Sequence, residues 1–280
     1  MTVIEIKNLS FYYSRKRPVY SDLSLKIEKG SVSAILGLNG AGKTTLFNLI
    51  AGFLIPKEGS CKVSYYESSK RSPEMLQELF MVSDISEFPN MVIDKFCKLY
   101  ADFYPRFDYN LFTNCLAEFN LSSKQSLKHL SLGEKRKVML SFALATRCKL
   151  LLFDEPTNGL DIPSKSTFRK MIAANLEEDQ TILLATHQVR DLGNLMDRII
   201  IEHQGKIILN ETTDQISEKL LFGVKVTDVN PNDLFYSDEN VASNECVAIN
   251  RNSHSSKLDI EQLFNAAISD PQKISLVFNS

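Results

Sequence analysis

The stretch GLNGAGKT, residues 37–44, lies between a continuously apolar run at 32–36 and an apolar pattern of helical period. A continuously apolar run is typical of a strand that is buried on both faces. After the loop, apolar residues recur at three- and four-residue steps until Gly52, which is a common helix stop. The sequence therefore predicts a strand, a glycine-rich loop and a helix, in that order.

The loop fits the phosphate-binding pattern GxxxxGK[ST]. Glycines let the backbone turn its N–H groups toward an anion, and the dipole of the following helix favours the same charge. In this pattern Lys43 reaches the β and γ phosphates of a nucleotide, and the Thr44 hydroxyl binds Mg²⁺. The alternative is a glycine-rich turn that only joins a strand to a helix, and the flanking strand and helix patterns disfavour it. The predicted phosphate-binding residues are Gly37, Asn39, Gly40, Ala41, Gly42, Lys43, Thr44 and Thr45.

Two acids, Asp154 and Glu155, end a second apolar run at 150–153. Acids at the carboxyl end of a strand in an open α/β sheet lie beside the phosphate site. We expect Asp154 in the shell of Mg²⁺ and Glu155 as the group that polarises the attacking water, because phosphoryl transfer depends mainly on positioning and charge stabilisation. The alternative is an acidic strand end that only faces solvent.

Between these two motifs, LSLGE at residues 130–134 precedes a further helical pattern. Ser131 and Glu134 have the spacing of a capping box, in which the serine oxygen accepts a helix N–H and the glutamate reaches back. Capping boxes are common, so taken alone these residues favour a purely structural interpretation.

The order of five motifs resembles that of the ATP-binding cassette (ABC) ATPases: GLNGAGKT, LSLGE, LLLFDEP, NGLD at 158–161, and Thr186-His187. In that family the second motif is the signature, usually LSGGQ. The resemblance covers residues 3–220. It implies an α/β fold, a P-loop NTPase cassette over residues 1–220 with an antiparallel β subdomain and a helical subdomain at about 85–130. Residues 221–280 then form a small α+β C-terminal extension.

The same resemblance implies roles for single residues. Ser131 and Gly133 would touch the γ-phosphate of ATP held by a second, facing cassette, so the site is shared across a dimer. His187 resembles the switch histidine, which contacts the γ-phosphate and senses its loss, so the predicted catalytic residues are Glu155 and His187. Asp161 resembles the D-loop aspartate, although it could also cap the helix that begins near residue 162.

Two further positions depend on alignment. Tyr13 is where the family places an aromatic ring that stacks on adenine, although 11–13 could equally be ordinary strand residues. Asp84 stands where the family has the Q-loop glutamine, and as a shorter, charged group it would bind Mg²⁺ directly or through water. In the signature, Leu132 and Glu134 replace a glycine and a glutamine.

Composition limits the possible functions. The 32 Lys and Arg against 34 Asp and Glu give a net charge of −2, which leaves no global field to attract nucleic acid. No stretch approaches the about 18 consecutive apolar residues of a membrane-spanning helix. The five cysteines are scattered without a CxxC pair, and we expect reduced, buried thiols.

These observations lead to an ATP-hydrolysing subunit that uses Mg²⁺, pairs with a second ABC ATPase subunit as a homo- or heterodimer, and powers a separate transmembrane permease. We expect a cytoplasmic protein held on the inner membrane face by that permease. We expect the transporter to be an exporter, because drug-exporter-type cassettes, which this chain resembles, carry similar C-terminal extensions. The alternative is a non-transport ABC ATPase that acts on ribosomes or nucleic acid. A GTPase or kinase is disfavoured, since no guanine-reading NKxD motif occurs and the order of the motifs argues against both.

Two regions outside the motifs have readable patterns. Residues 92–125 show helical periodicity and match the family's helical subdomain, whose exposed rings near Phe88 and 103–107 are candidates for contact with the permease. Toward the C-terminus, residues 224–226 and 246–249 predict strands, and 258–267 predict an amphipathic helix. Residues 230–244, rich in Asn, Asp and Ser, predict a loop.

Overall fold

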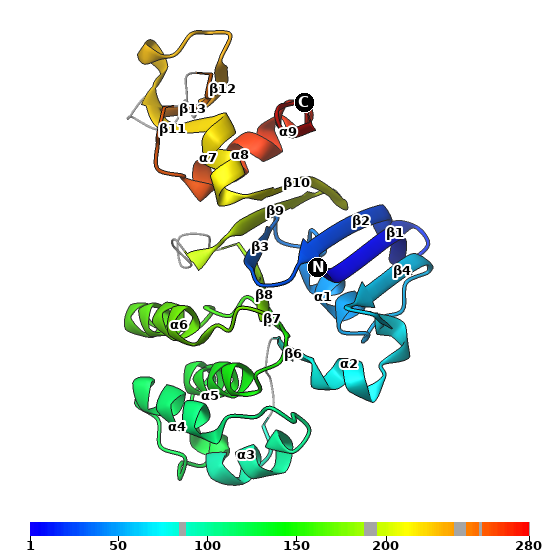
Figure 1. Cartoon of the computed structure of the whole chain (residues 1–280), viewed down its shortest axis with the longest axis vertical. Helices are drawn as coiled ribbons and strands as arrows, with labels where there is room; N and C mark the ends of the chain where they lie inside the picture. Colours follow the sequence, from blue (N-terminus) through cyan, green and yellow to red (C-terminus); the bar gives the residue numbers. More distant parts are fainter. Residues whose placement is uncertain (84–87, 188–194, 238–244, 252–253, 280) are drawn as a thin grey trace.

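The computed structural model describes residues 1–83, 88–187, 195–237, 245–251 and 254–279. In these residues the strands form three sheets of four, six and three strands. Figure 1 shows the six-stranded sheet in the middle of an elongated molecule, with the antiparallel sheet beside it, a group of helices at one end and the C-terminal elements at the other. The α/β fold class predicted from the sequence is confirmed.

The six-stranded sheet positions the functional motifs. Its order is β10-β9-β3-β8-β7-β6, and only β10 runs antiparallel to its neighbour. The strands are β3 (Val32–Leu36), β6 (Leu79–Val82), β7 (Leu150–Asp154), β8 (Thr181–Thr186), β9 (Arg198–His203) and β10 (Lys206–Thr212). Every residue of β3, β7 and β8 is buried, as their continuous apolarity predicts. Their carboxyl ends therefore meet at one edge.

The antiparallel sheet has the order β2-β1-β4-β5. Its strands are β1 (Thr2–Ser14), β2 (Arg17–Glu28), β4 (Glu58–Val63) and β5 (Tyr66–Glu67). Helix α1 (Lys43–Ile50) shares one buried apolar cluster with β1, β2 and the central strands. Because α1 is held by both sheets, the loop that precedes it is fixed at both ends. The short helix α2 (Pro73–Gln77) leads into β6.

A group of helices lies at one end of the molecule, where the Phe142 ring is buried (Figure 1). They are α3 (Ile93–Ala101), α4 (Tyr109–Glu118), α5 (Leu132–Ala145) and α6 (Ile162–Asn175). Five aromatic rings lie within 6.0 Å of the Phe142 ring, those of Phe80, Phe96, Tyr104, Phe107 and Phe112. The helical periodicity of 92–125 is thus confirmed as two helices, α3 and α4, with turns between them at 102–108.

The C-terminal elements form a small α+β unit, as predicted. They are α7 (Thr213–Lys219), β11 (Leu220–Lys225), β12 (Leu234–Ser237), β13 (Glu245–Ile249), α8 (Ile260–Ser269) and α9 (Pro271–Asn279), with the sheet order β11-β13-β12. Single turns of 3₁₀ helix occur at Ser68–Lys70, Leu127–His129 and Val226–Asp228.

Two expectations for this unit are wrong. The loop predicted over 230–244 contains β12, because Phe235 is buried and Leu234 pairs with Ala248 of β13. The strand predicted at 224–226 begins four residues earlier, at Leu220, and Val226 already opens a 3₁₀ turn. Strand β12 has only four residues, and its pattern is too short to predict a strand within a polar segment. Pairing with β13 determines that it forms a strand.

All five cysteines are buried and free, which confirms the expectation of reduced, buried thiols. Burial raises the pKa of the Cys61, Cys97 and Cys115 thiols to about 11, so these groups are neutral near pH 7. Among the helices of the described residues, none has the length and apolarity needed to cross a membrane.

Candidate functional site

The loop between β3 and α1 has a backbone that requires glycine. Gly40 and Gly42 have positive φ angles of 79° and 127°. A Cβ atom on Gly42 would lie 2.6 Å from the hydroxyl oxygen of Tyr20, so a side chain there meets buried structure as well as backbone strain. Gly42 provides no side-chain cap for α1. The free N–H groups of the first turn therefore remain available to an anion.

Lys43 is folded back onto its own loop. Its Nζ atom donates to the carbonyl oxygens of Gly37 at 2.7 Å and Leu38 at 3.2 Å, and the residue is only 7% exposed. Burial lowers the pKa of the Lys43 ammonium, and this shift is opposed by three nearby carboxylates, those of Glu155, Glu202 and Asp154. An anion that reaches the loop would thus meet a cation whose present partners are two neutral carbonyls.

Thr44 and Asp154 meet across the edge of the sheet. The Thr44 hydroxyl donates to Oδ2 of Asp154 at 2.6 Å, although 110 residues separate them. Burial raises the pKa of Asp154, and the hydrogen bond from Thr44 opposes that shift. A hydroxyl and a carboxylate oxygen at this distance fit the all-oxygen ligand preference of Mg²⁺, which keeps several waters and takes few protein ligands.

Glu155 and His187 form the second pair at this edge. Oε1 of Glu155 lies 2.7 Å from Nδ1 of His187 and 3.1 Å from the backbone nitrogen of the same residue. Oε2 accepts a hydrogen bond from the Thr186 hydroxyl at 3.2 Å. The Thr186 hydroxyl, the His187 N–H and the His187 ring therefore orient the carboxylate of Glu155, which directly follows β7.

The backbone of Glu155 is itself unusual. Its φ angle is 47°, in the left-handed region that few residues other than glycine adopt. The backbone N–H of Glu155 donates to the Ala185 carbonyl at 2.8 Å, and Arg136 Nη1 of α5 donates to the Glu155 carbonyl at 2.6 Å. Hydrogen bonds from two other elements therefore stabilise this strained residue: its N–H is bonded to β8, and its carbonyl oxygen is bonded to α5.

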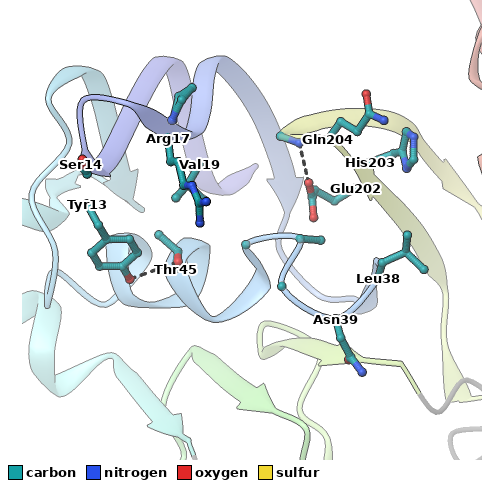
Figure 2. A pocket seen from close by; sticks show the side chains of 15 residues that line it. Tyr13, Ser14, Arg17, Val19, Leu38, Asn39, Thr45, Glu202, His203 and Gln204 are labelled. Carbon is teal, nitrogen blue, oxygen red and sulfur yellow. Dashed lines mark hydrogen bonds between the residues drawn. The ribbon is translucent and has the colours of Figure 1, made fainter.

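A pocket of about 810 Å³ opens beside the loop (Figure 2). Tyr13 lines it from the end of β1, and its hydroxyl oxygen lies 3.2 Å from Oγ1 of Thr45. Tyr13 is 68% exposed, whereas Phe11 is buried at 4%, so of the two rings only Tyr13 offers a free face. The pocket is closed on the other side by the β9–β10 turn, with Gln204 and Gly205.

The LSLGE residues lie elsewhere, at the start of α5. The capping box is present: the backbone N–H and the hydroxyl of Ser131 both donate to Oε2 of Glu134 at 2.8 Å, and Glu134 N–H donates to Ser131 Oγ at 3.2 Å. These bonds lower the pKa of Glu134. Neither Ser131 nor Gly133 is among the described residues that line the pocket.

The segment after Glu155 contacts the start of α5. A Cβ atom on Gly133 would lie 2.7 Å from the Gly159 carbonyl oxygen, so the two backbones touch. Asp161 caps α6 by accepting from the Ser164 N–H at 2.7 Å, and its other oxygen lies 3.8 Å from Lys137 Nζ. The capping alternative for Asp161 is therefore present in the structure, and its role across a dimer stays a prediction.

Asp84, the predicted Q-loop position, lies outside the described residues. Two residues at the site were not predicted. Arg136 sits two positions after the signature, where its contact with Glu155 has no sequence signal. Glu202 ends the apolar run 199–201, and an acid in that place is the same signal that identified Asp154.

The parallel sheet, the loop and the acids at the strand ends define a P-loop nucleotide-binding protein. The family model described as ABC transporter matches residues 20–158. A putative ABC transporter ATP-binding protein of Caldanaerobacter subterraneus is 32% identical over 78% of this chain and 96% of its own length. The ABC transporter ATP-binding protein NatA of Bacillus subtilis is 30% identical over 70% of this chain and 83% of its own.

A solved structure described as the ATP-binding subunit of an ABC transporter superposes with a TM-score of 0.69 at 26% identity, covering 77% of this chain and 92% of that one. The chain belongs to the ABC transporter family and is one of its ATP-binding ATPase subunits. The resemblance drawn from the motif order is confirmed at this level.

Proposed function

We propose that this chain hydrolyses MgATP at a site shared between two cassettes and powers a separate permease. The observation that carries the proposal is the pairing of two contacts at one sheet edge, Thr44 with Asp154 and Glu155 with His187. The first pair offers oxygen ligands beside the phosphate loop. The second orients a carboxylate toward the same edge.

Lys43 and the loop bind the phosphates in this proposal. The ammonium exchanges its two carbonyl partners for the β and γ phosphates, while the N–H groups at the start of α1 hold the phosphate oxygens. Mg²⁺ would be held by Thr44 and Asp154, where it neutralises charge that develops on the phosphates. Tyr13 offers its exposed ring face to the base.

Glu155 is proposed as the general base. Its carboxylate takes a proton from the attacking water, and Thr186 and His187 hold the carboxylate in place. The Nδ1 atom of His187 lies 2.7 Å from Oε1 of Glu155, and in this proposal the other ring nitrogen contacts the γ-phosphate. A His187 that senses the γ-phosphate would therefore transmit its loss to the catalytic carboxylate.

A second ATPase subunit supplies the remaining contacts. Ser131 and Gly133 lie at a helix start with exposed Leu132 between them, and this surface is suited to a phosphate on a facing chain. Asp161 lies on the segment that touches Gly133 through Gly159, so it would link the two shared sites. The partner subunit is a second copy of this chain or a related cassette.

The permease partner is proposed from the family, whose ATP-binding subunits work with transmembrane subunits. The proposed cassette is 1–220, with its helical subdomain at about 85–130, and the extension is 221–280. We propose export as the direction, since drug-exporter-type cassettes carry C-terminal extensions that the α+β unit here resembles. The subunit would then lie on the cytoplasmic face of the membrane.

Co-purification from detergent-solubilised membranes tests this function. A tagged chain is expected to capture a multi-spanning membrane protein, and transport by vesicles that carry the complex then gives the direction. As a matched control, the same purification with a Lys43→Ala chain separates assembly from turnover. Recovery only with ribosomes or nucleic acid would contradict the transporter function and favour the non-transport alternative.

A further inference from the structure

Glu202 is a buried acid below the phosphate loop that no part of the proposed mechanism uses. It lies on β9, next to β3, in a register that pairs Leu36 with Ile201 and so places Glu202 beside Gly37. The residue has no exposed surface. Oε1 accepts from the Gly205 N–H at 2.8 Å, drawn as a dashed line in Figure 2, whereas Oε2 has no hydrogen-bond partner among the described residues.

The unpartnered oxygen faces the loop. A Cβ atom built on Gly37 would lie 3.1 Å from Oε2 of Glu202, so this oxygen lies directly behind the first glycine of the loop. The Gly37 carbonyl is also the closer acceptor of the Lys43 ammonium. Glu202 and Lys43 are therefore separated by little more than one loop residue, and each shifts the pKa of the other.

The other titratable groups around Glu202 are few. From β2, the Tyr20 hydroxyl is buried, has no described partner and interacts electrostatically with Glu202. From the loop and α1, Lys43 is the facing charge. On the β9–β10 hairpin itself, His203 is half-buried and Lys206 is exposed. Lys43 is thus the cation that a charged Glu202 meets from the loop.

We propose that Glu202 is a positioning residue that holds Lys43 in its retracted place and opposes phosphate binding, so that its charge sets the affinity for nucleotide. The proposal rests on the proposed function, because it concerns the same phosphate site. A buried carboxylate attracts the ammonium from behind the loop and repels the phosphates in front of it, and water screens neither interaction well. A neutral Glu202 does neither.

The charge of Glu202 depends on pH in a direction that can be stated. Burial raises the pKa of Glu202, while the Gly205 hydrogen bond and Lys43 oppose that shift. Below that raised pKa the acid is neutral and affinity is high. Above it the carboxylate is charged and affinity falls. By linkage, a bound polyphosphate raises the same pKa further.

The test is Glu202→Gln, which keeps the oxygen that accepts from Gly205 and removes the charge. Calorimetric titration with MgADP, which is not hydrolysed, is carried out from pH 5.5 to 8.5 on the parent and the variant. We expect the variant to bind about three- to ten-fold more tightly at pH 8.5, the size expected for a buried charge at an effective dielectric constant of about 20. The gain should shrink toward pH 5.5.

Taking the ratio of the two proteins at each pH cancels the titration of the free nucleotide, which is the same for both. Glu211→Gln on β10 is the matched control and should follow the parent at every pH. If Glu202→Gln does not fold, Glu202→Met removes the same charge with an apolar chain of similar length.

Equal or weaker MgADP binding by the Glu202 variant at pH 8.5 would overturn the inference. The same increase in affinity at every pH would also overturn it, because the increase would then come from the changed shape of the side chain and not from its lost charge. Normal MgADP binding by the parent in those cases leaves the proposed function intact. No MgADP binding by either protein would overturn both.

Discussion

The phosphate loop and the LSLGE motif each lead into the N-terminus of a helix. Other parts of the same chain surround the first of these helix ends, whereas the second is exposed. The loop before α1 is enclosed by β3, β9 and β2. Its lysine donates to carbonyls of the loop itself, and its threonine donates to Asp154, 110 residues away. The start of α5 is exposed, and its serine is bonded to Glu134 of the same helix turn. We propose from this contrast that the loop before α1 supplies one chain's contacts to the phosphates, whereas the start of α5 contacts the nucleotide of a facing chain.

The largest effect is expected at the enclosed end. Lys43→Ala should abolish tight MgATP binding, because the loop has no other cation and a P-loop lysine reaches both outer phosphates. Equilibrium binding of a fluorescent ATP analogue measures it. Lys135→Ala on α5, a lysine outside the loop, is the control. A Lys43 variant that still bound and hydrolysed ATP like the parent would mean that the loop is misassigned.

Glu155→Gln should separate binding from chemistry at the same end. The amide keeps the shape and most of the contacts to His187 and Thr186 but cannot take a proton, so turnover should fall by about 100-fold or more while ATP affinity stays within a few-fold. Phosphate release and ATP binding measured on one preparation test this. Unchanged turnover would remove Glu155 from the role of base.

A smaller effect is expected where the two regions touch. Gly133→Ala would place a Cβ atom 2.7 Å from the Gly159 carbonyl, so the start of α5 or the segment after Glu155 must shift. We expect turnover to fall several-fold at unchanged ATP affinity, with a loss of about 1–3 kcal/mol in the free energy of unfolding. Leu132→Ala, at an exposed neighbour, is the control. Equal turnover in both variants would mean that the contact between the start of α5 and the segment after Glu155 does not affect catalysis.

The smallest effect is expected at Asp84. Asp84→Gln restores the residue usual in the family, so ATPase activity should stay measurable while the optimal Mg²⁺ concentration shifts. Activity measured across a range of Mg²⁺ concentrations decides. A folded variant without activity would instead make the carboxylate an obligatory metal ligand.

The enclosed region was largely predictable from the sequence, since Lys43, Thr44, Asp154 and Glu155 each follow a buried strand and parallel strand ends converge. The contact of Arg136 with the Glu155 carbonyl was not, because any long side chain on α5 has the same sequence pattern. Glu202 carried the strand-end signal without the flanking motif that marks Asp154.

The C-terminal extension shows the same limit. The amphipathic pattern of α8 identified it, because a helix carries its period locally. Strand β12 has only four residues, and its place depends on β13, so polar composition around it predicted a loop. Long-range pairing therefore decided what local sequence left open.

We propose above that the exposed start of α5 completes the phosphate site of a second chain. The most direct test of this proposal is light scattering coupled to size-exclusion chromatography of Glu155→Gln, with and without MgATP. We expect an ATP-dependent dimer, and we expect the added Ser131→Arg substitution to disperse it, because a bulky cation is disfavoured at a helix N-terminus. A Glu155→Gln protein that binds ATP yet stays monomeric at every concentration, or a dimer indifferent to Ser131→Arg, would contradict it.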